Sequence, residues 1–155
     1  HVQDKEVQYA TGRYMREKPF RTAYELDDVL GLVKEVYKDR VEFHDGDAEL
    51  SPGFSVHFIG GHTMGMQCVR LWTERGWLVL ASDASHLYAN MEKVQPFPIV
   101  FDVGQMVDGY RTLRKLADSR DHIIPGHDPL VLKRYPPATK ELEGIVVRLD
   151  QPPLP

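Results

Sequence analysis

The spacing of apolar residues along this 155-residue chain indicates which segments fold as helices and which as strands. Between residues 22 and 38 the spacing is that of an amphipathic helix, with apolar side chains at Leu26, Val29, Leu30, Val33 and Val36. The segment Thr22-Ala23-Tyr24-Glu25 has the form of a capping box, so we expect the helix to start there. We expect its apolar stripe to pack on the core, and residues 1–20 to be irregular.

From residue 41 to 82 the period becomes that of strands. Phe54, Val56 and Phe58 alternate with polar residues, which predicts a strand with one buried face. Apolar runs at 68–72 and 77–81 flank a polar turn and favour an antiparallel hairpin. After a long connection at 84–104, a second amphipathic helix carries its apolar residues from 106 to 117, and a short strand follows at 122–124. Strands and helices in both halves predict a single domain, 1–155, of the α/β class.

Composition and charge exclude several classes of protein. With 42% hydrophobic and 27% charged residues the chain has an ordinary globular balance. A formal net charge of -4 provides no electrostatic footprint for nucleic acid or an anionic membrane, and no apolar run approaches the ~20 residues of a membrane span. We expect a cytoplasmic protein whose single cysteine, Cys68, is a buried structural thiol within an apolar run.

Three polar residues stand where predicted strands end. His62 follows Gly60-Gly61 after one strand, Asp83 ends the strand at 78–82, and His127 follows Pro125-Gly126 after another. Taken singly, His62 fits a turn histidine, Asp83 a cap of the next turn, and His127 a loop hydrogen bond. Together they favour a metal site at one sheet edge, where nitrogen and oxygen donors suit zinc, manganese or iron.

The order of these motifs resembles the metallo-β-lactamase superfamily. The matching features are the Gly-His-Thr-x-Gly segment at 61–65, a strand ending in Asp83, and a later strand ending in Gly126-His127. Residues 82–85 and 124–129 resemble the N-acyl homoserine lactonase group in particular, and the resemblance extends from Val2 to about Pro136. It implies the αβ/βα sandwich of that superfamily, of which this chain would form the C-terminal part.

The resemblance also implies a chemistry. His62 would bind one divalent ion, His127 a second, and Asp83 would bridge the two ions, which we expect to be zinc, with manganese or iron as alternatives. A metal-bound hydroxide would then attack the carbonyl of a lactone or another small ester. The lactonases place a tyrosine three positions after the bridging aspartate, whereas this chain has His86. An imidazole at this position can donate a proton or a hydrogen bond to the substrate; the alternative is that His86 only lines the loop.

One departure from the family is large. Its His-x-His-x-Asp-His motif, the source of four ligands, is absent from the sequence. The remaining residues give each ion two protein ligands, fewer than the three or more of hydrolytic zinc sites. We therefore expect the chain alone to be inactive, and to act with a complementary N-terminal segment or chain, or as a homo-oligomer. Hydrolysis of a thioester or another small ester is one alternative; a catalytically incomplete structural or interaction domain is the other.

Overall fold

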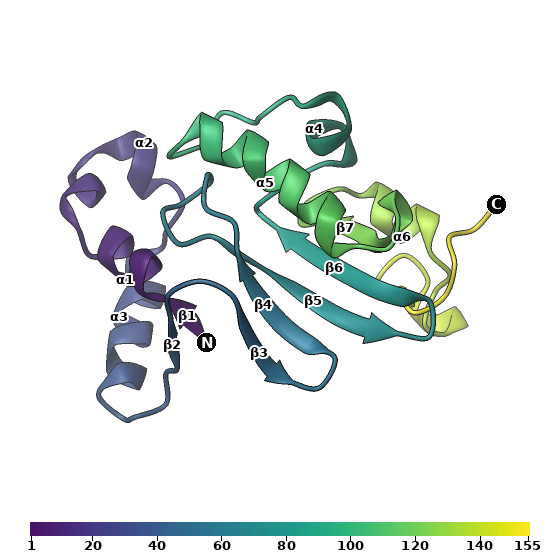
Figure 1. The fold of residues 1–155 in the computed structure, drawn as a ribbon, viewed down its shortest axis with the longest axis horizontal. Helices are drawn as coiled ribbons and strands as arrows, with labels where there is room; N and C mark the ends of the chain where they lie inside the picture. The colour runs from purple at the N-terminus through teal and green to yellow at the C-terminus, as the bar shows by residue number, and fades with distance from the viewer.

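The computed structural model describes all 155 residues, and a five-stranded sheet lies at its centre with two smaller strands and the N-terminal helices at one end (Figure 1). The strands are β1 Val2–Gln3, β2 Phe43–His44, β3 Ala48–Ser51, β4 Phe54–Phe58, β5 Gln67–Thr73, β6 Gly76–Ser82 and β7 Ile123–Pro125. The α-helices are α1 Asp4–Ala10, α2 Lys18–Arg21, α3 Leu26–Val36, α4 Tyr88–Lys93, α5 Val103–Leu116 and α6 Leu130–Arg134. Short 3-10 turns occupy Arg13–Arg16, Arg120–His122 and Lys140–Leu142. None of the helices is long and apolar enough to cross a membrane.

Strand direction decides where the loops emerge. The sheet has the order β3-β4-β5-β6-β7, in which β3 to β6 pair antiparallel and β7 pairs parallel to β6. The predicted hairpin of β5 and β6 is confirmed, with Trp72 opposite Trp77. Because β4, β6 and β7 run in the same direction, the segments that follow them leave from the same edge of the sheet.

The main core lies between this sheet and α5 (Figure 1). The predicted second helix is confirmed, since α5 buries Met106, Tyr110 and Leu113. These side chains pack with the sheet residues Ile59, Cys68, Val79, Ala81 and Ile123. The opposite face holds a smaller cluster of Leu78, Ile124 and Tyr135, which α6 and the C-terminal tail partly cover. The sheet is therefore buried most deeply on the α5 side.

The N-terminal third differs from the sequence prediction. Residues 1–20 are not irregular: they contain β1, α1 and part of α2, and β1 pairs parallel with β2. The reason is a shared aromatic cluster, because Tyr9, Tyr14 and Phe20 all pack around Phe101 with ring centroids 5.0 to 6.1 Å from its ring. These contacts join residues distant in sequence, which no local pattern reveals.

The first predicted helix is present, but the predictions of its first residue and of its burial were wrong. It begins at Leu26, and Thr22 instead caps the end of α2, where its hydroxyl donates to the carbonyl of Lys18. No residue of α3 is buried, and Leu26 is 70% exposed. The helix lies at the end of the molecule, away from the five-stranded sheet (Figure 1), so its apolar stripe has no core to pack against. The long connection at 84–104 likewise contains a helix, α4, that was not predicted.

Two glycines offer a matched test of backbone conformation. Gly61 has a φ of +86°, and a Cβ there would lie 2.6 Å from the backbone of Met106. Gly61→Ala should therefore lower the free energy of unfolding by at least about 1 kcal/mol. Gly31 lies in α3 with open space around it, so Gly31→Ala should raise the same quantity by about 0.5–1 kcal/mol. Urea denaturation followed by circular dichroism measures both, and equal effects would contradict this account.

The environment of Cys68 makes a second prediction. Its side chain is 1% exposed, and burial, assisted by the negative charge of Asp47, raises the pKa of the thiol to about 12. A thiol in this state is neither accessible nor ionised at neutral pH. Ellman's reagent at pH 8 should leave the folded chain unmodified and should titrate its single cysteine in 6 M guanidinium, where ~6 M denaturant unfolds small domains. Rapid reaction of the folded chain would show that this side of the core opens.

Candidate metal centre

His62 is held by a tight loop after β4. Gly60 and Gly61 both have positive φ, of +70° and +86°, a region that L side chains rarely adopt. The carbonyl of Gly61 accepts from the backbone N–H groups of Phe101 and Asp102 at 2.8 and 2.9 Å, which ties the loop to the start of α5. The His62 Nδ1 donates to the carbonyl of Ile99 at 2.8 Å. Its Nε2 therefore carries the free lone pair, the arrangement that metal-binding histidines use.

The segments after β6 and β7 are locked to each other. Ser82 ends β6 with a φ of +48°, and the pairing of β6 with β7 shifts register beside it. The Gly126 N–H lies within hydrogen-bond distance of the carbonyls of Ser82 and Ser85, at 3.2 and 3.0 Å. A Cβ at Gly126 would lie 2.7 Å from the Ser82 oxygen, so only glycine allows this approach. The contact brings Asp83 and His127 to the same point.

The Asp83 carboxylate lies at the centre of the resulting cluster. Its Oδ1 is 2.6 Å from the His127 Nε2 and 3.0 Å from the His86 Nε2. His62, Asp83 and His86 each offer a ligand atom, and these three atoms all lie within 4.8 Å of one another. The structure thus brings His62, Asp83 and His86 together, while His127 joins them through Asp83. His127 is also the most open of the four, with 60% of its side chain exposed.

His86 is the best packed member of the cluster. Its ring stacks on Phe97, with centroids 3.5 Å apart and planes 9° from parallel, and the Phe97 ring also lies 5.5 Å from that of His62. Burial lowers the pKa of His86; Asp83 opposes this shift, and the rings of His127 and His62 add to it. The imidazole is therefore neutral at pH 7 and has a lone pair available for a metal or for a hydrogen bond.

The donors present fit a divalent metal ion. A tetrahedral ion with bonds of ~2.0–2.2 Å places neighbouring ligand atoms about 3–3.5 Å apart, and the Asp83 oxygen and His86 nitrogen are 3.0 Å apart. Imidazole nitrogen with carboxylate oxygen is a donor set of zinc, manganese and iron sites. A cation would also satisfy the Asp83 carboxylate, whose other contacts are the two imidazoles and a long hydrogen bond from the Ser82 hydroxyl.

Sequence reasoning missed the groups that orient the cluster. The Ile99 carbonyl that fixes the His62 ring and the Phe97 ring beneath His86 both come from the long connection between α4 and α5. A backbone carbonyl has no sequence pattern, and the contact of Phe97 with His86 depends on how the long connection folds back over the loop after β6. Phe101, from the same connection, packs with the N-terminal aromatic cluster.

Three solved structures with the same fold are informative. An N-acyl homoserine lactone hydrolase, with N-hexanoyl-L-homoserine at its catalytic metal centre, matches with a TM-score of 0.63 and 27% identity over 82% of this chain and 46% of its own. The dizinc quorum-quenching lactonase AidC matches at 0.57 and 16% identity, over 83% and 47%. The hydrolase AbOPH of the beta-lactamase superfamily matches at 0.58 and 17% identity, over 83% and 47%.

Comparison of the sequence alone finds no protein-family model and no curated protein that matches this chain. The structural matches span less than half the length of each relative. Within that span the order of strands and helices is that of a hydrolase fold, as the sequence motifs predicted. The chain is therefore a structural relative of the N-acyl homoserine lactonases and of the metallo-β-lactamase superfamily hydrolases, and it shares their α/β fold over 82–83% of its own length and 46–47% of theirs.

Proposed function

We propose that this chain carries one half of the active site of a metal-dependent hydrolase that opens a lactone of the N-acyl homoserine type. The observation that supports this most directly is the Asp83 carboxylate, whose Oδ1 meets the nitrogens of both His86 and His127. A carboxylate between two imidazoles is suited to a pair of cations, and the structural relatives include a dizinc lactonase.

The residues would divide the work as follows. His62 would hold one ion through Nε2, because Nδ1 is committed to Ile99. His127 would hold the second, and Asp83 would be shared between them. Two divalent ions, zinc by analogy with the dizinc lactonase among the structural relatives, would lower the pKa of water and polarise the ester carbonyl. His86, neutral and fixed on Phe97, would hydrogen-bond the substrate or its leaving oxygen.

The donor count places a condition on activity. Two protein ligands for each ion are fewer than hydrolytic zinc sites use, so we propose that the remaining donors come from a His-x-His-x-Asp-His segment outside these residues. The relatives are about twice as long as this chain, which leaves room for such a segment. Phe54, 40% exposed and paired across the strands with Leu71 on the face turned away from α5, offers apolar surface for a complementary part.

A thioester or another small ester is a second candidate substrate. The observation that favours it is His86 itself, which stands three residues after Asp83. An imidazole is shorter than the tyrosine side chain that the lactonases have at this position. This would change which leaving group the site can support, without changing the metal ligands.

Metal binding by the isolated chain tests the cluster directly. Addition of Co²⁺ should give visible absorption bands with weak affinity, because only part of the ligand set is present. Asp83→Ala should weaken binding at least about 10-fold, since it removes the central donor. Asp108→Ala is the matched control: this exposed carboxylate pairs only with Arg111 on α5, so its loss should not change the titration. Equal effects of the two substitutions would contradict the assignment.

Activity tests the substrate. The chain should be assayed alone and together with a polypeptide that carries the His-x-His-x-Asp-His segment, in zinc-containing buffer. We expect release of acid from N-hexanoyl homoserine lactone only in the combined preparation, and a loss of at least about 100-fold in kcat for Asp83→Asn. A combined preparation that binds two metals and cleaves a thioester but no lactone would favour the second candidate. One that cleaves neither would contradict the hydrolase proposal.

A further inference from the structure

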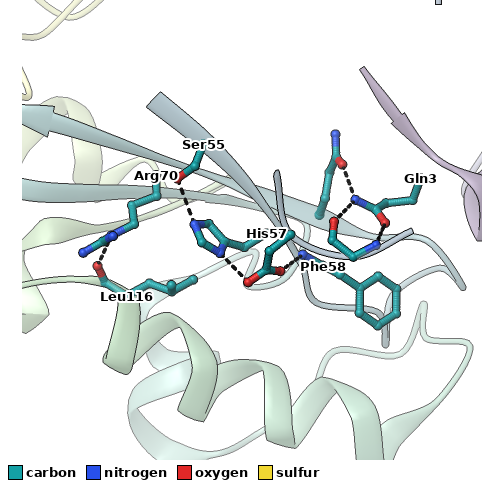
Figure 2. Close-up of polar contacts among 9 residues, drawn as sticks. Gln3, Ser55, His57, Phe58, Arg70 and Leu116 are labelled. Atoms are coloured by element: carbon teal, nitrogen blue, oxygen red, sulfur yellow. Dashed lines mark hydrogen bonds and ion pairs between the residues drawn. The ribbon is translucent and has the colours of Figure 1, made fainter. Parts of the chain in front are cut away.

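A second cluster of polar side chains lies on the α5 side of the sheet, built from β4 and the turn before β3. The Ser55 Oγ is 2.9 Å from the His57 Nε2, and the His57 Nδ1 is 2.8 Å from the Asp47 Oδ2. Figure 2 shows this chain of contacts, running from Ser55 through the His57 ring to a carboxylate. We propose that Ser55, His57 and Asp47 form a metal-independent nucleophilic site that reacts with small esters through Ser55.

The sheet itself places these groups. Ser55 and His57 are two residues apart on β4, so their side chains point to the same face. Ala48 pairs with Val56 across β3 and β4, which puts Asp47 beside the end of β4. The Asp47 Oδ1 accepts from the Phe58 N–H at 2.9 Å, so the carboxylate is fixed by one oxygen and presents the other to His57.

The turn that carries Asp47 is anchored from the N-terminus. Gln3 is 2% exposed, and its side-chain amide donates to the Gly46 carbonyl at 2.8 Å and accepts from the Gly46 N–H at 2.9 Å (Figure 2). Gln67 on β5 accepts a further hydrogen bond from the same amide. These hydrogen bonds hold the backbone next to Asp47 beside the end of β4.

The hydrogen bonds assign the proton positions. A carboxylate only accepts, so the His57 Nδ1 must donate to Asp47, and the His57 Nε2 then has the lone pair that accepts from the Ser55 hydroxyl. This is the order of contacts by which an imidazole acts as a general base for a serine. The His57 side chain is 13% exposed while that of Asp47 is 62% exposed. The base is thus sheltered, and its orienting group faces water.

A cavity of about 370 Å³ opens beside this cluster, and its walls include Asp47, Ser55, His57, Arg70 and Trp77. Arg70 is the cross-strand partner of Ser55. Its guanidinium lies 3.6 Å from the centre of the Trp77 ring, and its Nε donates to the Leu116 carbonyl at 2.8 Å. A fixed positive charge next to the hydroxyl would stabilise negative charge that develops on a carbonyl or phosphoryl oxygen. The cavity suits a small neutral ester.

The chemistry balances without a cofactor. With an ester, the Ser55 Oγ forms a bond to the carbonyl carbon while His57 takes the hydroxyl proton. The bond to the alcohol oxygen then breaks, the alcohol leaves with that proton, and water releases the acid from Ser55. With a fluorophosphonate, the oxygen–phosphorus bond forms as the phosphorus–fluorine bond breaks. Fluoride leaves, and His57 holds the proton.

The chain contains its own control for chance pairing of serine with histidine. The Ser119 Oγ lies 2.7 Å from the His122 Nδ1, but the His122 Nε2 contacts the backbone carbonyl of Arg75. No carboxylate orients this ring or stabilises its protonated form. Ser119 should therefore be much less reactive than Ser55.

The experiment is covalent labelling of the full chain by an alkyl fluorophosphonate, with a chelator present so that the metal centre contributes nothing. Intact mass should show one adduct, and peptide mapping should place it on Ser55. Ser55→Ala should abolish labelling, and Ser119→Ala should leave its rate unchanged. His57→Gln should slow it at least about 100-fold, and Asp47→Asn about 10-fold, because the exposed carboxylate is screened by water. Asparagine keeps an acceptor for the Phe58 N–H, so this variant should remain folded.

Three outcomes of the labelling experiment would contradict the proposal. Absence of an adduct, an adduct on another residue, or equal rates for the native chain and the Asp47→Asn variant would overturn the proposal. Circular dichroism and thermal melting identify any variant that fails to fold, in which case the Asp47→Asn comparison decides. A stoichiometric burst of p-nitrophenolate from p-nitrophenyl acetate, unaffected by chelator and absent in Ser55→Ala, should accompany labelling. Neither result depends on the metal centre, so failure of this proposal would leave the proposed lactonase function untouched, and the reverse also holds.

Discussion

The hydrogen bonds from the Gly126 N–H to the carbonyls of Ser82 and Ser85 join the segments that follow the parallel strands β6 and β7. The candidate metal centre depends on this contact, because Asp83 lies between Ser82 and Ser85 in the sequence and His127 directly follows Gly126. The contact needs Ser82 in a left-handed conformation and a residue without Cβ at 126. Local strain of this kind persists where surrounding structure holds it, and it is concentrated at functional sites.

The chain uses carboxylate–imidazole pairs in two different ways. At the sheet edge, Asp83 faces two imidazoles and otherwise accepts only a long hydrogen bond, 3.4 Å, from the Ser82 hydroxyl, an arrangement that favours cations. On the α5 side, Asp47 accepts hydrogen bonds from one backbone N–H and one imidazole, and that imidazole accepts a hydrogen bond from a serine hydroxyl. The first geometry places several lone-pair donors around one point, which suits a cation. The second orients the His57 ring so that it can take the proton of the Ser55 hydroxyl. The same residue types would therefore support the proposed metal centre in one place and the proposed nucleophile in the other.

The N-terminal third has a supporting role that its composition does not suggest. Gln3 holds the turn that carries Asp47, and Glu6 accepts from the Thr63 hydroxyl and the Gly65 N–H in the loop that carries His62. One short stretch at β1 and α1 thus braces both polar clusters. Its partners lie 43 to 59 residues away in the chain, so each contact depends on the complete fold.

Local pattern was enough to predict α5, the β5–β6 hairpin, β4 and the three strand-end residues His62, Asp83 and His127, because hydrophobic period and glycine placement act over a few residues. It could not predict that α3 has no core to bury its apolar stripe, or that residues 1–20 fold around Phe101. Nor did it bring Ser55 and His57 beside Asp47. Those arrangements arise from strand direction, register and the packing of distant segments. Amino-acid order alone thus determined which residues were able to do chemistry, whereas the tertiary structure decided which of them meet, since hydrogen bonds and coordination act only over a few ångströms.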